Sequence, residues 1–147
     1  MNNKKLGFGL IFAAIGYAVY SLVNAATKLQ FGQIQLTQKR IQFNGLHLTL
    51  NFPIVNNDRK TSLPFNGFKG QLLYGTSELA KITIPQTLVI QANSTVNLLV
   101  NVDINFLDLG VNLLALIRSG DWLNAAYIVG NIKSAGVLFP VRQKITF

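Results

Sequence analysis

Few side chains in this sequence could carry acid–base, nucleophilic or metal chemistry. His47 is the only histidine, and the 147 residues include no cysteine. His47 lies on the polar side of the alternating segment LHLTLNF, and no second ligand at helical spacing accompanies it. We therefore interpret His47 as an exposed strand residue, in preference to a general base or a metal ligand.

The acidic residues do not form a site either. Asp103 and Asp108 both lie in DINFLDLG, a segment without the alternating oxygen ligands of a calcium loop. We expect Asp103 to be a solvated strand residue and Asp108 to be the N-cap of a helix. The sequence also contains no glycine-rich phosphate loop, nucleophile elbow or HExxH motif. These observations predict a protein that is not an enzyme, with no catalytic residue, no cofactor, no metal and no small-molecule substrate.

The net charge of +8 and the pI near 10.1 favour anionic neighbours such as lipid headgroups or nucleic acid. The basic residues are scattered along the chain, however, and no run exceeds two. A solvated basic surface is the simpler interpretation, and nucleic acid is a disfavoured partner. The lack of cysteine excludes disulfides and leaves the redox compartment open. Asn93-Ser94-Thr95 is a glycosylation sequon that has meaning only in a eukaryotic secretory pathway, so modification of Asn93 stays open.

The clearest element of the sequence is an uncharged apolar segment near the amino terminus. Residues 6–23 read LGFGLIFAAIGYAVYSLV. With residues 24–26 they would form a helix about 30 Å long, which matches the hydrocarbon core of a bilayer. Such a helix satisfies its own backbone polar groups, and Lys4, Lys5 and Lys28 flank it at the two interfaces. The sequence therefore predicts a single-pass anchor with a short basic tail over residues 1–28. The apolar positions of this anchor are Leu6, Phe8, Leu10, Ile11, Phe12, Ile15, Tyr17, Val19, Tyr20, Leu22 and Val23.

A cleavable signal peptide is the main alternative to a retained anchor. Lys4 and Lys5 resemble an n-region, and Val23-Asn24-Ala25 resembles a small-x-small cleavage site. The apolar stretch is long for the h-region of a signal peptide, so we expect a retained signal-anchor. The basic tail favours a cytoplasmic amino terminus and an extracytoplasmic domain, although Lys28 and Lys39-Arg40 nearly balance it.

The rest of the chain, residues 29–147, shows the two-residue alternation of β-strands. The alternation is strict over 46–52, and Pro53 and the polar run over 56–60 are expected to end that strand. Over 96–106 the even positions are all apolar and the odd positions are mostly polar. One face of each strand would then meet a core and the other would meet water or a partner. Further strands are expected within residues 31–43, 79–84, 127–132 and 137–147. Residues 65–74, interrupted by Gly67 and Gly70, are expected to form one kinked strand.

One segment changes to helical spacing. Leu109, Leu113, Leu116 and Ile117 would share a helix face, and Gly120 stands where a C-terminal cap is expected. Many short strands with one short packed helix predict a mainly β fold, an immunoglobulin-like or fibronectin-like β-sandwich preceded by the transmembrane helix.

The order of these elements resembles the late-embryogenesis-abundant type 2 family (LEA type 2, or water-stress and hypersensitive-response domain). The resemblance covers residues 46–147 and is carried by LHLTLNFPIVNN, FNGFKGQLLYG, KITIPQTLVIQANSTVNLLVNVDI, LLALIRSGDW and, above all, YIVGNIKSAGVLFPVRQKITF. Asn51-Phe52-Pro53 stands where the family usually has an Asn-Pro pair, so the turn at this point is expected to differ. The resemblance implies an immunoglobulin-like or fibronectin-like sandwich, often behind a spanning helix, with binding roles at membranes or in stress responses.

An anchor joined to a sandwich without catalytic groups predicts a membrane-anchored binding or structural module. We expect its partners to be the lipid bilayer and either other proteins or copies of this chain, bound through sheet faces or edges. Two alternatives stay open. One is a structural subunit of a membrane-associated or virion assembly, and the other is a module that binds polyanions, either nucleic acid or anionic lipid.

Overall fold

The computed structural model describes residues 28–146. The predicted anchor positions from Leu6 to Val23, with Lys4 and Lys5, lie outside the described residues. The described strands, the α-helix α2 and the 3-10 helices η1 and η2 follow in the order β1 (Leu29–Phe31), β2 (Ile34–Gln42), β3 (Gly45–Asn56), β4 (Leu63–Phe65), β5 (Phe68–Tyr74), β6 (Ser77–Ile84), β7 (Leu88–Ile90), β8 (Ser94–Asn105), η1 (Phe106–Asp108), α2 (Val111–Ser119), η2 (Asp121–Ala125), β9 (Ala126–Ser134) and β10 (Val137–Thr146).

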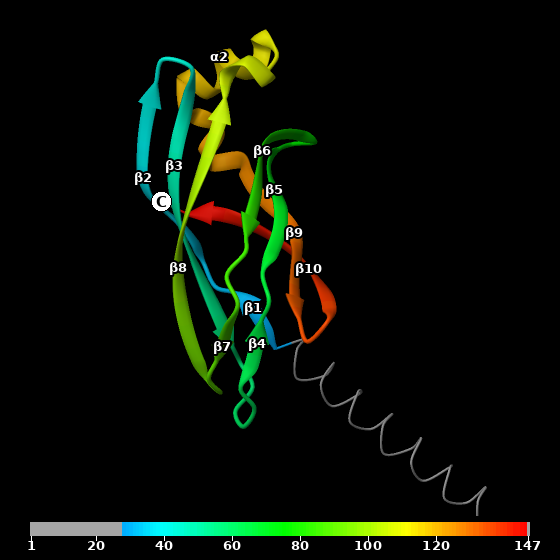
Figure 1. The fold of residues 1–147 in the computed structure, drawn as a ribbon. Helices are drawn as coiled ribbons and strands as arrows, with labels where there is room; N and C mark the ends of the chain where they lie inside the picture. The colour runs from blue at the N-terminus through cyan, green and yellow to red at the C-terminus, as the bar shows by residue number, and fades with distance from the viewer. Residues whose placement is uncertain (1–27, 147) are drawn as a thin grey trace, which may run out of the picture.

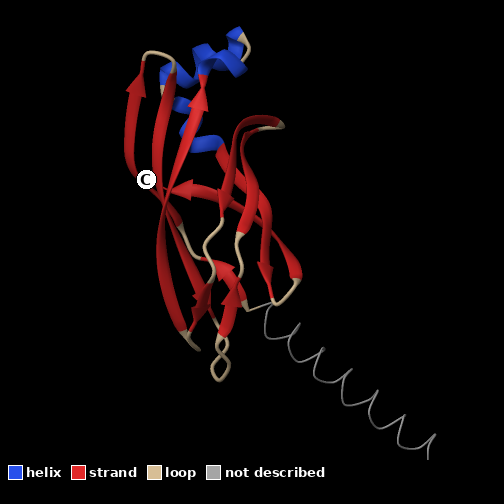
Figure 2. Ribbon diagram, in the orientation of Figure 1, coloured by secondary structure: helices blue, strands red, loops and turns tan. Residues whose placement is uncertain are grey.

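The strands form two layers that face each other (Figures 1 and 2). In the first layer β8 pairs along the whole of β3, and β1 and β2 share the other side of β3. In the second layer the order is β10-β9-β5-β6, with every pair antiparallel. The layers join where the end of β10 runs parallel to the start of β2, through Ile145 opposite Ile34. The prediction of a mainly β, sandwich-like fold with one short helix is confirmed for the described residues.

Three phenylalanine rings tie the two layers together in the core. Phe52 comes from β3 and Phe68 from β5, and Phe31 of β1 contacts both. The Phe31 centroid lies 5.2 Å from that of Phe52 and 5.1 Å from that of Phe68, edge to face in each case. All three side chains are buried, so this cluster adds favourable ring geometry to the hydrophobic burial that holds the layers together.

The alternation in residues 94–105 has the consequence that the sequence predicts. Val100, Val102 and Ile104 of β8 are buried, whereas the residues between them are exposed. A slip of one residue against β3 would exchange the buried and exposed sets, so the pairing register is strongly specified.

Pro53 does not end its strand as predicted, because β3 continues to Asn56, where the predicted polar run begins. The carbonyl of Pro53 accepts the N–H of Gly32 at 2.8 Å. In a strand the N–H and C=O of one residue point to the same side, so the missing N–H of Pro53 faces the gap between β1 and β2. No ladder hydrogen bond is lost there, and the proline is tolerated.

The prediction of one kinked strand over residues 65–74 is also wrong. The chain breaks at Gly67, whose φ of 111° favours glycine, and β4 pairs with β7 while β5 pairs with β6 and β9. Gly70 does not interrupt β5 but lies opposite Gly130 of β9. A Cβ atom on Gly70 or Gly130 would lie 2.5 or 2.6 Å from Cζ of Phe68, so these two glycines make the space for that ring.

Helix α2 packs against the core through Ile117, which is buried, and it ends at Gly120 with φ 82°, as the sequence predicts. The assignment of Asp108 as its N-cap is wrong. Gly110 occupies that position without a side-chain cap, and Asp108 belongs to η1. The chain leaves β8 through this 3-10 turn first, because Asn105 accepts the N–H of Leu107 at 3.0 Å and starts the turn before α2 begins.

Candidate binding surfaces

The loop of residues 57–62, between β3 and β4, is built around one buried amide. Asn56 donates from Nδ2 to the carbonyls of Thr61 at 2.9 Å and Ile90 at 3.0 Å. Its Oδ1 accepts the N–H of Asp58 at 2.9 Å. These three bonds close the loop and fasten it to β7. A buried amide whose donors and acceptor are satisfied specifies one loop conformation.

Asp58 fixes the middle of the same loop. Its carboxylate accepts the N–H groups of Lys60 at 2.9 Å and Thr61 at 3.0 Å, and Nζ of Lys28 lies 3.9 Å away. The two backbone N–H donors lower the pKa of the Asp58 carboxyl, and the charges of Lys28 and Lys60 add a smaller effect in the same direction. The carboxylate is therefore ionised and already engaged, while the side chains of Arg59 and Lys60 are exposed.

The loop lies at the end of the sandwich where the described chain begins, which we call the Lys28 end. The N–H of Asn57 donates to the carbonyl of Lys28 at 3.0 Å. The turn between β9 and β10 lies at the same end (Figure 1). It is held there because Asn66, just after β4, donates its N–H to the carbonyl of Lys133 at 2.8 Å and accepts the N–H of Ala135 at 3.0 Å.

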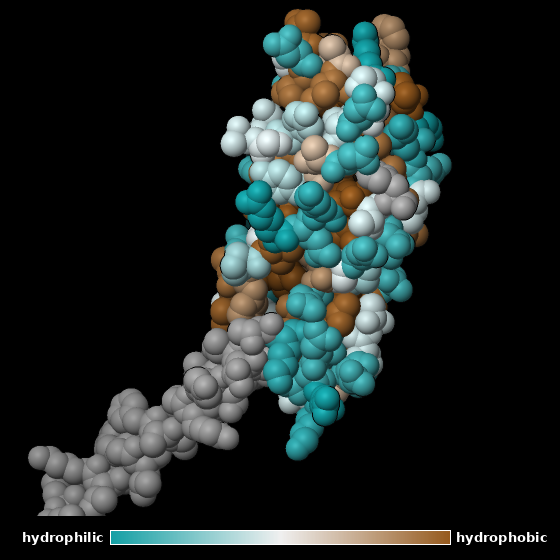
Figure 3. Space-filling view, turned by 180° about the vertical axis from the view of Figure 1, so that it is seen from behind, coloured by the Kyte–Doolittle hydropathy of each residue, from teal (hydrophilic) through white to brown (hydrophobic). Residues whose placement is uncertain are grey.

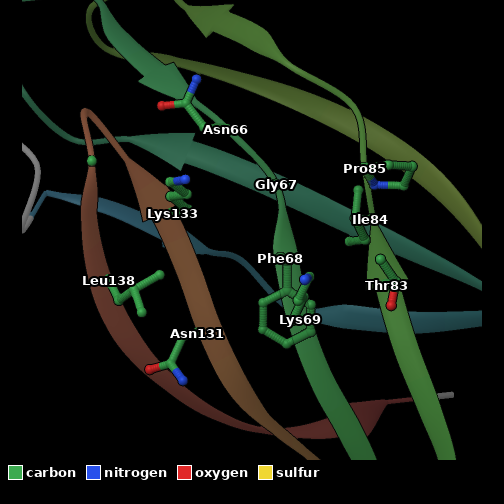
Figure 4. A pocket seen from close by; sticks show the side chains of 11 residues that line it. Asn66, Gly67, Phe68, Lys69, Thr83, Ile84, Pro85, Asn131, Lys133 and Leu138 are labelled. Carbon is green, nitrogen blue, oxygen red and sulfur yellow. The ribbon is translucent and has the colours of Figure 1, made fainter.

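An open pocket of about 650 Å³ lies beside the β9–β10 turn (Figure 4). Lys69 of β5 and Lys133 of β9 line it, together with the polar side chains of Asn66, Asn131 and Thr83. Apolar side chains, including that of Leu138, complete the wall. The lining residues, all within the described chain, include no carboxylate. Ammonium, amide and hydroxyl donors without a competing acid suit an anionic group better than a cation.

The outward face of β3 and β8 carries a row of paired polar side chains. His47 Nδ1 lies 2.6 Å from Asp103 Oδ1, and Thr49 donates to Asn101 at 3.1 Å. The His47 side chain is 21% exposed and that of Asp103 is 76% exposed. Asp103 is thus a solvated strand residue, as predicted, whereas His47 is partly covered and paired, not a freely exposed histidine. With one imidazole and one carboxylate, the pair is a cross-strand contact and lacks further convergent groups.

The end opposite Lys28 exposes a group of large apolar side chains, which we call the apolar tip. It consists of Ile41, Phe43, Leu107 and Val111, whose exposed fractions run from 70% to 103%. The turn at Phe43 and the start of η1 are tied together, because the N–H of Phe106 donates to the carbonyl of Asn44 at 3.0 Å. Apolar surface is visible at this end in Figure 3. Four of the seven exposed large apolar side chains described in residues 28–146 therefore gather at one end.

The length of β3 gives the distance between the two ends of the sandwich. It starts beside the tip at Gly45 and ends at Asn56, which opens the Lys28-end loop. Its twelve residues span about 36 Å at 3.3 Å per residue.

Of the residues predicted to flank the anchor, Lys28 lies within the described chain, and Lys4 and Lys5 do not. The role of Asn56 in holding the 57–62 loop was not predicted from the sequence. The signal that could have found this loop is Asn56-Asn57-Asp58 ahead of a basic pair, since Asn and Asp bond to backbone groups two or three residues on. Within residues 28–146, no three His, Cys, Asp or Glu side chains gather as a metal site would require. None of the helices in this part of the chain has the length and apolar character to cross a bilayer.

Comparison with known proteins supports the fold alone. No protein-family profile and no curated protein matches the sequence. The crystal structure of a protein from Archaeoglobus fulgidus is similar, with a TM-score of 0.51 at 10% sequence identity. The match covers 77% of this chain and 90% of the archaeal chain. At this identity the likeness shows a shared sandwich-like fold and carries no function.

Proposed function

We propose that this protein is a membrane-tethered, non-enzymatic binding module that presents a LEA type 2-like, immunoglobulin- or fibronectin-like sandwich. Residues 6–26 would be the tether, with the amino terminus in the cytoplasm and the sandwich on the other side of the membrane. The apolar tip is the observation that supports binding best. Exposed apolar groups gathered at one place mark contact sites, and an aromatic side chain such as Phe43 is typical of a binding hot spot.

The position of the tip suits a tethered binder. The chain enters the sandwich at Lys28, and the tip lies at the opposite end, about 36 Å along β3. A module anchored through residues 6–26 would hold Phe43 and Leu107 away from its own bilayer, where a protein on the same side of the membrane could cover them. We therefore expect the partner to be a protein with an apolar pocket.

Substitutions at the tip test this function. Phe43→Asn with Leu107→Gln should remove a protein that co-purifies with the intact, detergent-solubilised chain. The control is Val89→Gln with Leu99→Gln, which changes two exposed apolar side chains away from the tip and outside the pocket. The control variant should retain the partner. Equal retention by both variants would contradict a role for the tip.

The assembly-subunit alternative predicts a different result in the same preparation. A binding module should run as a monomer in neutral detergent once its partner is removed. A defined oligomer of this chain, lost in the Phe43→Asn and Leu107→Gln variant, would instead favour a structural subunit that pairs with copies of itself.

A further inference from the structure

The charged residues of the sandwich are unevenly divided between its two ends. The Lys28 end carries Lys28, Arg59, Lys60, Lys69 and Lys133, and the single acid beside them is Asp58. The other four acids of the chain lie elsewhere: Glu78 beside the β5–β6 turn, Asp103 near the end of β8, Asp108 in η1 and Asp121 in η2. Those parts of the chain lie toward the apolar tip (Figure 1). Lys39 and Arg40 of β2, Lys81 of β6 and Arg118 of α2 lie toward the same end and balance the four acids, so the larger excess of positive charge is at the Lys28 end.

The one acid at the Lys28 end does little to offset this charge. Asp58 accepts two backbone N–H groups and lies 3.9 Å from Nζ of Lys28, so its charge is locally balanced. Arg59 and Lys60 project from the loop without a carboxylate partner among the described ion pairs. The loop that displays them is rigid, because Asn56 fixes it through three hydrogen bonds.

We infer that the Lys28 end docks on anionic phospholipid headgroups of the membrane that holds the tether. Arg59 and Lys60 contact the headgroup layer, and the pocket between Lys69 and Lys133 receives a headgroup phosphate. Docking fixes the sandwich upright, with the apolar tip pointing away from the bilayer. The inference rests on the tether proposed above.

A lipid surface fits this end better than nucleic acid does. Arg59 and Lys60 lie in the loop that bonds to the backbone of Lys28, and the proposed tether would place Lys28 next to headgroups. The pocket wall is made of aliphatic and proline side chains at Ile84, Pro85 and Leu138, and its one aromatic residue, Phe68, is buried in the core. Stacking platforms for unpaired bases are therefore missing from the described pocket.

The test uses the full chain in vesicles, with a fluorescent label on one engineered cysteine. The chain has no cysteine of its own, so Ser62→Cys at the Lys28 end and Thr76→Cys at the β5–β6 turn each give a single site. An impermeant, environment-sensitive label is attached after reconstitution into phosphatidylcholine vesicles, either pure or with about 30 mol% phosphatidylglycerol. We expect the Ser62→Cys label to become shielded from iodide only in anionic vesicles, and to be released by about 0.5 M salt, while the Thr76→Cys label stays accessible.

Two double variants, each lacking two positive charges, test which basic residues contact the headgroups. Arg59→Gln with Lys60→Gln should lower the docked-to-undocked ratio about thirtyfold, since each basic group near an anionic surface contributes a factor of about five. Lys39→Gln with Arg40→Gln removes the same two charges from β2 near the tip, and it should change the ratio less than about twofold. Equal effects of the two variants, or an equally accessible Ser62→Cys label in both kinds of vesicle, would overturn the inference.

Two further measurements separate the outcomes. Flotation of the labelled chain with pure phosphatidylcholine vesicles at high salt reports the tether alone. A chain that floats while its Ser62→Cys label stays accessible in anionic vesicles refutes the docking and leaves the tether standing. Capture of a single-stranded oligonucleotide at physiological salt, lost in the Arg59→Gln and Lys60→Gln variant, would reassign this end to nucleic acid and overturn lipid docking.

Discussion

The amide of Asn56 should be a main determinant of stability at the Lys28 end. Asn56→Ala removes two donors and one acceptor from a site that is 1% exposed, and it leaves the carbonyls of Thr61 and Ile90 and the N–H of Asp58 without their partner. Each lost bond contributes about 1 kcal/mol, so the expected loss in free energy of unfolding is about 3 kcal/mol. For a domain of this size, that loss lowers the midpoint of thermal unfolding by about 10 °C.

Chemical and thermal unfolding of the detergent-solubilised chain, followed by the fluorescence of the buried Trp122, measures this loss. The control is Asn57→Ala, which changes a neighbouring asparagine whose side chain is exposed. The control should differ from the unsubstituted chain by less than about 0.5 kcal/mol. If Asn56→Ala falls within the same range as Asn57→Ala, the loop does not depend on the buried amide, and the rigid display of Arg59 and Lys60 loses its support.

Three further changes test other parts of the structure. Gly70→Ala should lower the free energy of unfolding by about 3 kcal/mol or more, because the added Cβ would meet the ring of Phe68. The control, Gly110→Ala, adds a Cβ in open space and should cost about 1 kcal/mol or less in the same unfolding assay. Asp58→Asn should be less stable than the unsubstituted chain at neutral pH, and the difference in free energy of unfolding should vanish as the pH falls. A carboxyl whose pKa is lowered in the folded state loses its stabilising effect when it is protonated. Unfolding curves between neutral and acid pH measure this difference. His47→Ala should cost no more than about 1 kcal/mol in denaturant unfolding, because its carboxylate partner is largely exposed; a larger loss would show that the pair does more than join two strands.

The sequence predicts the layers of this sandwich well where one strand alternates strictly. From Val96 to Ile104 the even positions of β8 are apolar, and they are the positions that face the core. The spacing of Leu113, Leu116 and Ile117 likewise places one short helix correctly, since a repeat near 3.6 residues is incompatible with a strand.

The strand predictions are wrong at positions whose structure depends on the neighbouring strand in the sheet. Pro53 is tolerated because β1 gives way to β2 at that point, and the sequence of β3 alone cannot show this. Gly67 divides two strands, whereas Gly70 continues one, because Gly70 has Gly130 and the ring of Phe68 as neighbours.

The candidate surfaces were predicted less completely than the fold. The contact of His47 with Asp103 depends on the register of β3 against β8, which joins residues far apart in the chain. The basic residues look scattered along the sequence because Arg59 and Lys133 come together at the Lys28 end only when β4 and the β9–β10 turn pack side by side. Charge segregation of this kind is a property of the folded chain.

The tether is tested most directly by removing residues 1–26 and following the chain in membrane flotation at high salt. The full chain should float with neutral vesicles at about 0.5 M salt, where electrostatic docking is screened, and the shortened chain should stay in the soluble fraction. A shortened chain that still floats with the vesicles under these conditions would contradict the account, because the sandwich itself would then hold the membrane without the predicted anchor.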